Sequence, residues 1–170
     1  MNVTGYKLRE ALRRWQLRRD TASGQFSKVL IAFPNEKKPS PYEIAEQVLT
    51  AELSIANLQA AQSYYNSQVR VMVGATEITL LECIKRVGGL GRVEKMWRTA
   101  ATVKEDRYAS LHDIRTRKAD EVVAERTVTY EEAGKNAAEL GQRLGAYREA
   151  IAIGNAREVD IPNLNAALFE

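Results

Sequence analysis

The stretch SPYEIAEQVLTAELSIANLQAAQSYY, residues 40–65, decides the fold class of this chain. It opens with a serine N-cap, a proline at the first helical position and a glutamate three residues after the cap, a combination that is typical of a helix start. From Ile44 to Tyr65, apolar residues recur at steps of four and three residues. We therefore expect a helix of about 27 residues, roughly 40 Å long, which needs a partner of similar length.

Before this helix, the sequence predicts another helix and an extended segment. Residues from about Tyr6 to Ser23 follow the same amphipathic pattern, and Gly24 is the expected helix stop. The segment Lys28–Phe33 is short, apolar and followed by Pro34, which favours a strand or an extended arm. A polar loop then leads to the serine cap.

After the long helix, the sequence predicts a small hairpin. Val69–Val73 alternates in polarity, Gly74–Thr76 can turn, and Glu77–Thr79 can return. Thr79 and Glu82 form a second capping box, which predicts the start of a third helix.

The third helix is predicted to continue towards Leu111 and Ile114. Gly88, Gly89 and Gly91 lie inside it, and each costs about 1 kcal/mol relative to alanine. A kink or a break at these glycines therefore stays open.

A fourth helix is predicted near the end of the chain. Thr127 and Val128 suggest a short extended piece, and Thr129 with Glu132 forms a third capping box. An unbroken four-and-three pattern follows at Ala133, Ala137, Leu140, Leu144, Tyr147, Ile151 and Gly154. Small residues on this helix predict a close approach to another helix: Ala133, Gly134, Ala137, Gly141 and Gly145.

These elements predict an all-α fold, an elongated bundle of about four long helices with short extended or hairpin links, in a single domain covering residues 1–170. Leu49, Leu53 and Ala60 lie beside the Ile44–Tyr65 pattern, so the long helix is apolar on more than one side. A second copy is the simplest cover for that surface, and we expect a homo-oligomer.

The charges are segregated along the chain. The net charge is +3 overall, with +4 in residues 1–20, +6 in residues 84–118 and −5 in residues 119–170. The simplest interpretation is that basic and acidic helices neutralise each other, within the chain or between subunits. The alternative is a nucleic-acid or anion contact. The candidate residues are Arg9, Arg13, Arg14, Arg18, Arg19, Lys85, Arg86, Arg92, Lys95 and Arg98.

Residues for catalysis are scarce. The chain has one cysteine, Cys83, and one histidine, His112, so we expect neither a catalytic residue nor a metal or cofactor site. The segment Gly88–Arg92 fits neither the dinucleotide-binding nor the P-loop pattern. Cys83 is expected to be a buried, inert thiol. The sequence identifies no small-molecule substrate, and an enzyme is not expected.

The longest apolar run, Val29–Phe33, is far shorter than a membrane-spanning helix requires, and we see no signal-peptide pattern. We therefore expect a cytoplasmic protein. The first helix nevertheless combines Trp15 with several arginines, a composition that interfacial membrane helices share. Burial of Trp15 in the bundle core gives the same sequence pattern.

The order of features resembles a septicolysin-like family of small uncharacterised bacterial helical proteins. The resemblance is carried by Lys7–Leu12 in the first helix, by Ile78–Glu82 after the glycine turn, and by Thr127–Thr129 and Gly154–Asn155 around the last helix. It implies an all-helical, elongated fold without a known catalytic site. The family's toxin-like label suggests pore formation, but no spanning segment in this sequence supports that activity.

The sequence thus predicts a non-enzymatic structural or protein-interaction component that self-associates through helical seams. Two alternatives remain, a nucleic-acid-binding protein that uses a basic helix face and a membrane-associating, toxin-like protein.

Overall fold

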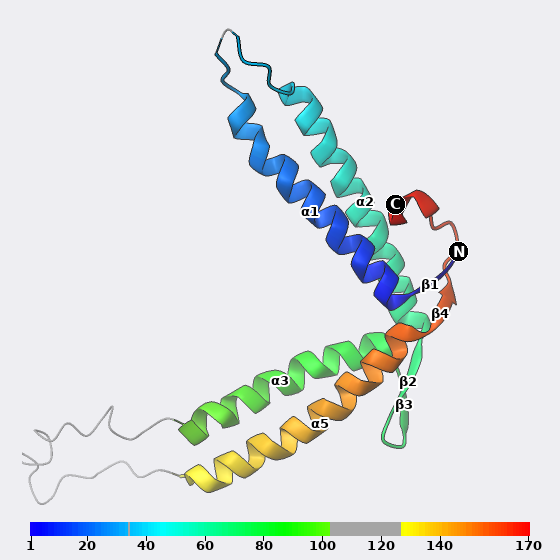
Figure 1. Cartoon of the computed structure of the whole chain (residues 1–170). Coiled ribbons are helices and arrows are strands. Elements are labelled where there is room, and N and C mark those ends of the chain that lie inside the picture. Colours follow the sequence, from blue (N-terminus) through cyan, green and yellow to red (C-terminus); the bar gives the residue numbers. More distant parts are fainter. Residues whose placement is uncertain (34, 103–126) are drawn as a thin grey trace, which may run out of the picture. The chain divides into compact units, whose positions relative to one another are not determined.

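The computed structural model describes residues 1–33, 35–102 and 127–170 (Figure 1). These residues are mostly helical, as predicted, and they also form two small antiparallel sheets of two strands each. The elements in chain order are β1 (Asn2–Thr4), α1 (Gly5–Val29), α2 (Pro41–Gln68), β2 (Arg70–Val73), β3 (Thr76–Thr79), α3 (Leu80–Thr102), α5 (Tyr130–Ala156), β4 (Glu158–Asp160) and the 3-10 helix η2 (Ala166–Phe169).

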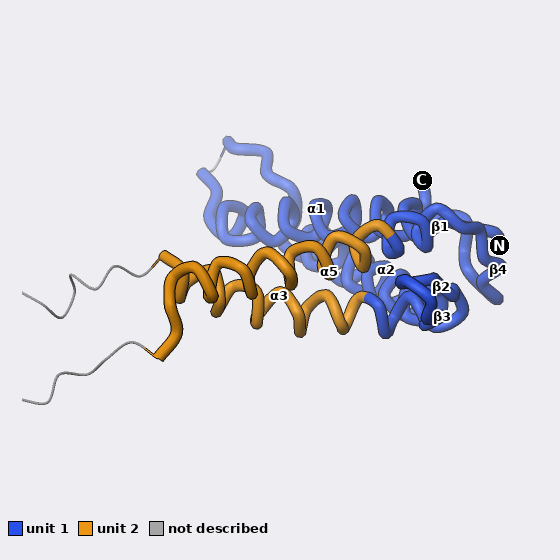
Figure 2. The backbone as a smooth tube through the Cα atoms, turned by 90° about the horizontal axis from the view of Figure 1, so that it is seen from below, with its two compact units in different colours: residues 1–83, 150–170 blue, residues 84–149 orange. Residues whose placement is uncertain are grey.

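The chain divides into two compact units (Figure 2). The first unit contains residues 1–83 and 150–170, and the second contains residues 84–149. Helices α3 and α5 each contribute residues to both units.

In the first unit, α1 and α2 pack side by side along most of their length (Figures 1 and 2). Each helix buries one apolar stripe against the other, which explains why the long predicted helix required a partner. The stripe of α1 contains Leu8, Ala11 and Ala22. The stripe of α2, its inner face, contains Ile44, Ala51, Ile55, Leu58, Ala61 and Tyr65.

The predicted helix starts are confirmed at their caps. At α2, the Ser40 hydroxyl accepts from the backbone of the first turn, and Glu43 accepts from the Ser40 N–H at 3.2 Å. The Thr129 backbone N–H donates to Glu132 at 2.9 Å, and this bond, with one from the Thr129 hydroxyl, lowers the pKa of Glu132. Thr79 Oγ1 accepts from the backbone N–H of Glu82 at 3.1 Å. Each helix therefore begins where its own sequence satisfies the free N–H groups.

The predicted hairpin is also confirmed. β2 pairs with β3, with Val71 opposite Ile78. The turn between them contains Gly74 with a φ of 61°, a left-handed conformation that glycine adopts without steric cost.

The second sheet was not predicted. β1 pairs with β4, so that Asn2 lies opposite Asp160 and Thr4 opposite Glu158. Val3, the central residue of β1, is 1% exposed. This sheet joins β1, the first element of the chain, to β4, which follows α5.

A buried polar junction lies where α1 begins and where α2 and α5 end. The Tyr65 hydroxyl contacts the carbonyl oxygens of Gly154 and Arg157, both at 2.7 Å, and its burial raises the pKa of Tyr65. A Cβ atom added at Gly5 would lie 2.3 Å from Asn155 Oδ1 and 2.9 Å from the Tyr65 ring. Only glycine fits this position.

In the second unit, α3 and α5 run alongside each other (Figures 1 and 2). Arg86 Nη1 donates to the Tyr147 hydroxyl at 3.3 Å between them. Ala133 and Leu144 of the predicted α5 pattern are buried here.

Two predictions about the region around α1 are wrong. The helix does not stop at Gly24 but continues to Val29, and Lys28–Phe33 forms the helix end and a bend instead of a strand. One internal glycine costs about 1 kcal/mol, which the packing of Ala22 and the continued helix hydrogen bonds offset. Ile31 and Phe33 are exposed.

The question left open at Gly88 and Gly89 is answered, because α3 runs through them without a break. The prediction of an extended piece at Thr127 and Val128 is wrong, because these residues form a bend. The glycines of α5 do not mediate the predicted close approach, because a Cβ atom would meet no described atom within 4 Å at Gly134, Gly141 or Gly145. The predicted continuation of the third helix to Leu111 and Ile114 lies outside the described residues, as does His112.

Candidate functional site

Helix α2 has a second apolar stripe on the side away from its inner face. We call this stripe the outer face of α2. Its residues recur at steps of three, four and four, repeated twice, which keeps them on one side of a helix. They are Tyr42, Ala45, Leu49, Leu53, Ala56, Ala60 and Tyr64, and all are exposed.

The exposure of the outer face is large. Tyr42 is 85% exposed, Leu53 60%, Leu49 52% and Tyr64 40%. Single exposed apolar residues are common on protein surfaces, whereas a contiguous stripe is typical of an interaction site. Leu49, Leu53 and Ala60, which the sequence placed beside the inner pattern, all belong to it.

The charged residues of α2 are all acidic and all lie in its N-terminal half. The helix contains no lysine or arginine, and its three carboxylates, Glu43, Glu46 and Glu52, lie in its first twelve residues. Glu43 closes the N-terminal cap, and Glu52 lies 3.5 Å from Arg19 of α1. Arg19 also bonds to Asp20, and this bond, together with the nearby Glu52, raises the pKa of Arg19. Residues 53–68 carry no charge.

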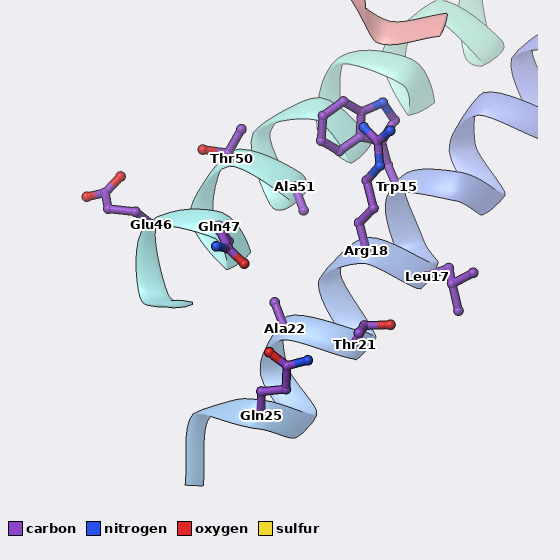
Figure 3. A pocket seen from close by; sticks show the side chains of 10 residues that line it. All are labelled: Trp15, Leu17, Arg18, Thr21, Ala22, Gln25, Glu46, Gln47, Thr50 and Ala51. Carbon is purple, nitrogen blue, oxygen red and sulfur yellow. The ribbon is translucent and has the colours of Figure 1, made fainter. Parts of the chain in front are cut away.

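A groove of about 630 Å³ runs between α1 and α2 (Figure 3). Leu17 and Glu46 lie at its two margins, and Ala22 and Ala51 face each other between the helices. The Arg18 guanidinium stacks on the Trp15 ring at 4.6 Å from the ring centre. The groove therefore has a mostly apolar lining with polar side chains among it.

Trp15 is held by the end of the chain. Its Nε1 donates to the carbonyl oxygen of Leu168 at 2.9 Å, and Leu168 is itself buried. Trp15 is partly buried and also lines the groove, so it is not fully enclosed in a core as the sequence interpretation supposed.

The basic residues predicted on the first helix all lie on α1, but they do not form one face. At 100° per residue, Arg9 and Arg13 lie on a different side of the helix from Arg14 and Arg18. Arg14 donates to the Phe169 carbonyl at 2.6 Å, and Arg18 donates to that of Glu170 at 3.4 Å. Arg9 lies 6.0 Å from the centre of the Tyr6 ring.

The other predicted basic residues lie on α3, in the second unit. Arg86 contacts Tyr147, and Arg98 Nε donates to Glu94 Oε1 at 2.9 Å. Lys85, Arg92 and Lys95 are exposed. The two basic sets thus belong to different units of the chain.

The described ranges contain no cluster of metal-binding side chains. Within residues 1–33, 35–102 and 127–170, no group of three or more histidine, cysteine or carboxylate side chains could hold a metal ion. Cys83 is 0% exposed, as expected of a core thiol. Among the helices of the same ranges, none combines the length and the apolar composition needed to cross a bilayer.

The full extent of the outer face was missed from the sequence. The outer face also includes Tyr42, Ala45, Ala56 and Tyr64, which were not predicted from the sequence. A signal was present, because a second three-and-four pattern runs beside the first one. That signal identifies an exposed stripe only once the side covered by α1 is known.

The comparisons with known proteins show a shared fold. Neither the scan of protein-family models nor the search of curated proteins gives a match. A crystal structure of a functionally unknown conserved protein from Corynebacterium diphtheriae is similar, with a TM-score of 0.74 and 16% sequence identity, over 94% of this chain and 100% of that chain. At this identity the likeness establishes the fold alone.

Proposed function

We propose that the protein is a non-enzymatic structural or protein-interaction component that self-associates, and that the outer face of α2 is the seam it uses. The observation that carries the proposal is the apolar stripe exposed from Tyr42 to Tyr64. Only its last residues, Ala60 and Tyr64, lie beside another described part of the same chain, residues 161–168. A helix that is apolar on two sides requires a partner on each. α1 supplies one of these partners, and a second copy supplies the other.

The energetics favour a reversible contact. Complete burial of a large apolar side chain contributes about 1.5–3 kcal/mol. Tyr42, Leu49, Leu53 and Tyr64 are already partly covered, so each contributes less than that. Two copies bring eight such side chains together, against an association cost of about 4–15 kcal/mol. We therefore expect a dimer whose population depends on concentration.

The proposed assembly differs from the bundle that the sequence predicted within a single chain. A pair of α1–α2 hairpins joined at the outer faces of α2 would contain four helices in contact, although each chain contributes only two of them. In this view the bundle is a property of the assembly. The resemblance to the septicolysin-like family remains a separate prediction.

The test is the mass in solution of the wild type and of Leu53→Glu, measured by light scattering over micromolar concentrations. We expect the wild-type mass to rise above the 19.1 kDa of one chain as concentration increases. Leu53→Glu introduces a carboxylate into the centre of the seam and should hold the protein at the monomer mass.

Leu17→Glu is the matched control. Leu17 is 67% exposed, close to the 60% of Leu53, but it lies on α1 at the margin of the groove. This variant should associate like the wild type. A wild type that stays at 19.1 kDa at every concentration contradicts self-association. If Leu17→Glu becomes monomeric and Leu53→Glu does not, the copies associate through the α1–α2 groove instead of the outer face.

A further inference from the structure

We propose that two copies of α2 pair in antiparallel orientation, with a two-fold axis at Leu53. This inference rests on the proposed function and specifies the direction and register of the contact. It follows from the order of residues along the outer face and from the distribution of charge on the same helix.

The outer face reads nearly the same in both directions from Leu53. Tyr42 and Tyr64 lie eleven residues before and after it. Ala45 and Ala60 lie eight residues before and seven after, and Leu49 and Ala56 lie four before and three after.

A two-fold axis perpendicular to the helices brings each residue against the position equally far on the other side of Leu53 in the other copy, so this order of residues places similar side chains together. In the antiparallel pair, each Tyr42 meets the Tyr64 of the other copy. The larger Leu49 side chain of one copy then lies near the smaller Ala56 of the other copy. The two positions are offset by one residue, because Leu49 is four residues from Leu53 and Ala56 is three.

The charge of α2 also favours the antiparallel direction. All three carboxylates of the helix precede Leu53, and the sixteen residues from 53 to 68 are uncharged. A parallel pair would bring the acidic halves of the two helices together, although Glu43 is held in the N-terminal cap and Glu46 lines the α1–α2 groove. An antiparallel pair places each acidic half against an uncharged half, which avoids most of that repulsion. Glu52, next to the axis, lies beside Arg19 of its own chain.

The spacing suits two straight helices. The steps of three, four and four make an eleven-residue repeat, or about 3.67 residues per turn. This value is close to the 3.6 residues of an ordinary α-helix, so the stripe stays nearly parallel to the helix axis. From Tyr42 to Tyr64 it extends over about 33 Å at 1.5 Å per residue.

Disulfide formation between engineered cysteines tests the direction. The full chain is used in three variants, Leu53→Cys, Tyr42→Cys and Tyr64→Cys, with the wild type and its buried Cys83 as the background control. One of the two tyrosine variants carries an affinity tag, so that mixed dimers are recognised by mass. A disulfide requires Cα atoms about 4.4–6.8 Å apart.

The antiparallel pair predicts that Leu53→Cys is cross-linked with itself. Tyr42→Cys and Tyr64→Cys should each remain uncross-linked alone, because like positions lie about 33 Å apart, and should form a mixed disulfide when combined. Cross-linking of Tyr42→Cys with itself overturns the antiparallel direction while leaving the proposed self-association in place.

Two further results would contradict, one each, the position of the two-fold axis and the use of the outer face as the contact surface. A mixed disulfide of Tyr42→Cys with Leu53→Cys, in the absence of one with Tyr64→Cys, overturns the axis at Leu53. A wild-type dimer by light scattering with no cross-link in any combination overturns the assignment of the outer face, and a monomeric wild type overturns the proposed function itself.

Discussion

Tyr64 and Tyr65 are neighbours in the sequence and lie on opposite sides of α2. Tyr65 is 0% exposed, and its hydroxyl contacts two backbone carbonyls. Tyr64 is 40% exposed on the outer face. The inner and outer faces have similar apolar residues and similar spacing, but the rest of the first unit covers the inner face far more completely. An apolar pattern therefore identifies a surface that requires a partner, and the fold decides whether that partner comes from the same chain.

The largest expected difference between the two faces is in folding stability. Leu58 on the inner face is 0% exposed, and Leu58→Ala should lower the free energy of unfolding by about 2–5 kcal/mol through lost burial and a residual cavity. Leu53→Ala on the outer face should change the stability of the monomer by about 0.5 kcal/mol or less. Urea unfolding at a concentration where the protein is monomeric measures both. Equal losses would show that the outer face is covered within the chain.

The next largest difference is expected between the stability effects of removing the hydroxyl groups of Tyr65 and Tyr64. Tyr65→Phe leaves the carbonyls of Gly154 and Arg157 without the hydroxyl and should lower the free energy of unfolding by about 1–3 kcal/mol. Tyr64→Phe serves as the control and should have almost no effect on the monomer. Thermal unfolding of the two variants, followed by circular dichroism, provides the measurement. A neutral Tyr65→Phe would mean that water replaces the hydroxyl.

Two glycines of α5 allow the same comparison, because Gly154 is packed closely against other residues and Gly141 is not. A Cβ atom at Gly154 would lie 2.8 Å from Val71 Cγ1, so Gly154→Ala should destabilise the protein by about 1 kcal/mol or more. At Gly141 a Cβ atom meets no described atom within 4 Å, and Gly141→Ala should stabilise the helix by about 0.4–1 kcal/mol. Urea unfolding should show a lower free energy of unfolding for Gly154→Ala and a higher one for Gly141→Ala. A destabilising Gly141→Ala would indicate a contact on that side of α5.

The smallest expected effect is a pH dependence at the inner tyrosine. Burial raises the pKa of Tyr65 above its usual value, so the unfolded chain loses this proton at a lower pH than the folded one. The associated stability is present below about pH 10 and is lost as the pH rises through the folded-state pKa. Unfolding experiments between about pH 9 and pH 11 should show a shallower decline for Tyr65→Phe than for Tyr64→Phe. Identical slopes would contradict the raised pKa.

The sequence predicted the helix starts well because each is determined by neighbouring residues. Ser40 with Glu43 and Thr129 with Glu132 form their caps within one turn, independently of the rest of the fold. Helix ends depend more on packing. α1 passes Gly24 because its next residues continue along α2, which the composition of α1 does not reveal.

The parts that were missed depend on contacts between distant residues. β1 and β4 are three residues each, too short to show a pattern, and they pair across almost the whole chain. Arg14 and Arg18 suggested a phosphate surface, whereas both donate to carbonyls at the end of the chain. The outer face was predicted only in part, because its limits depend on where α1 lies.

The first unit is assembled from two segments that are synthesised at different times. Residues 84–149 leave the ribosome between them, and at about 5–20 residues per second this takes several seconds. During that interval Gly154, Arg157 and β4 have not been synthesised. The Tyr65 hydroxyl and the backbone of β1 therefore lack their native hydrogen-bond partners. At that stage the native contacts of Tyr65 are still missing, and the proposed contact between outer faces could form between chains on one polysome before the native fold is complete.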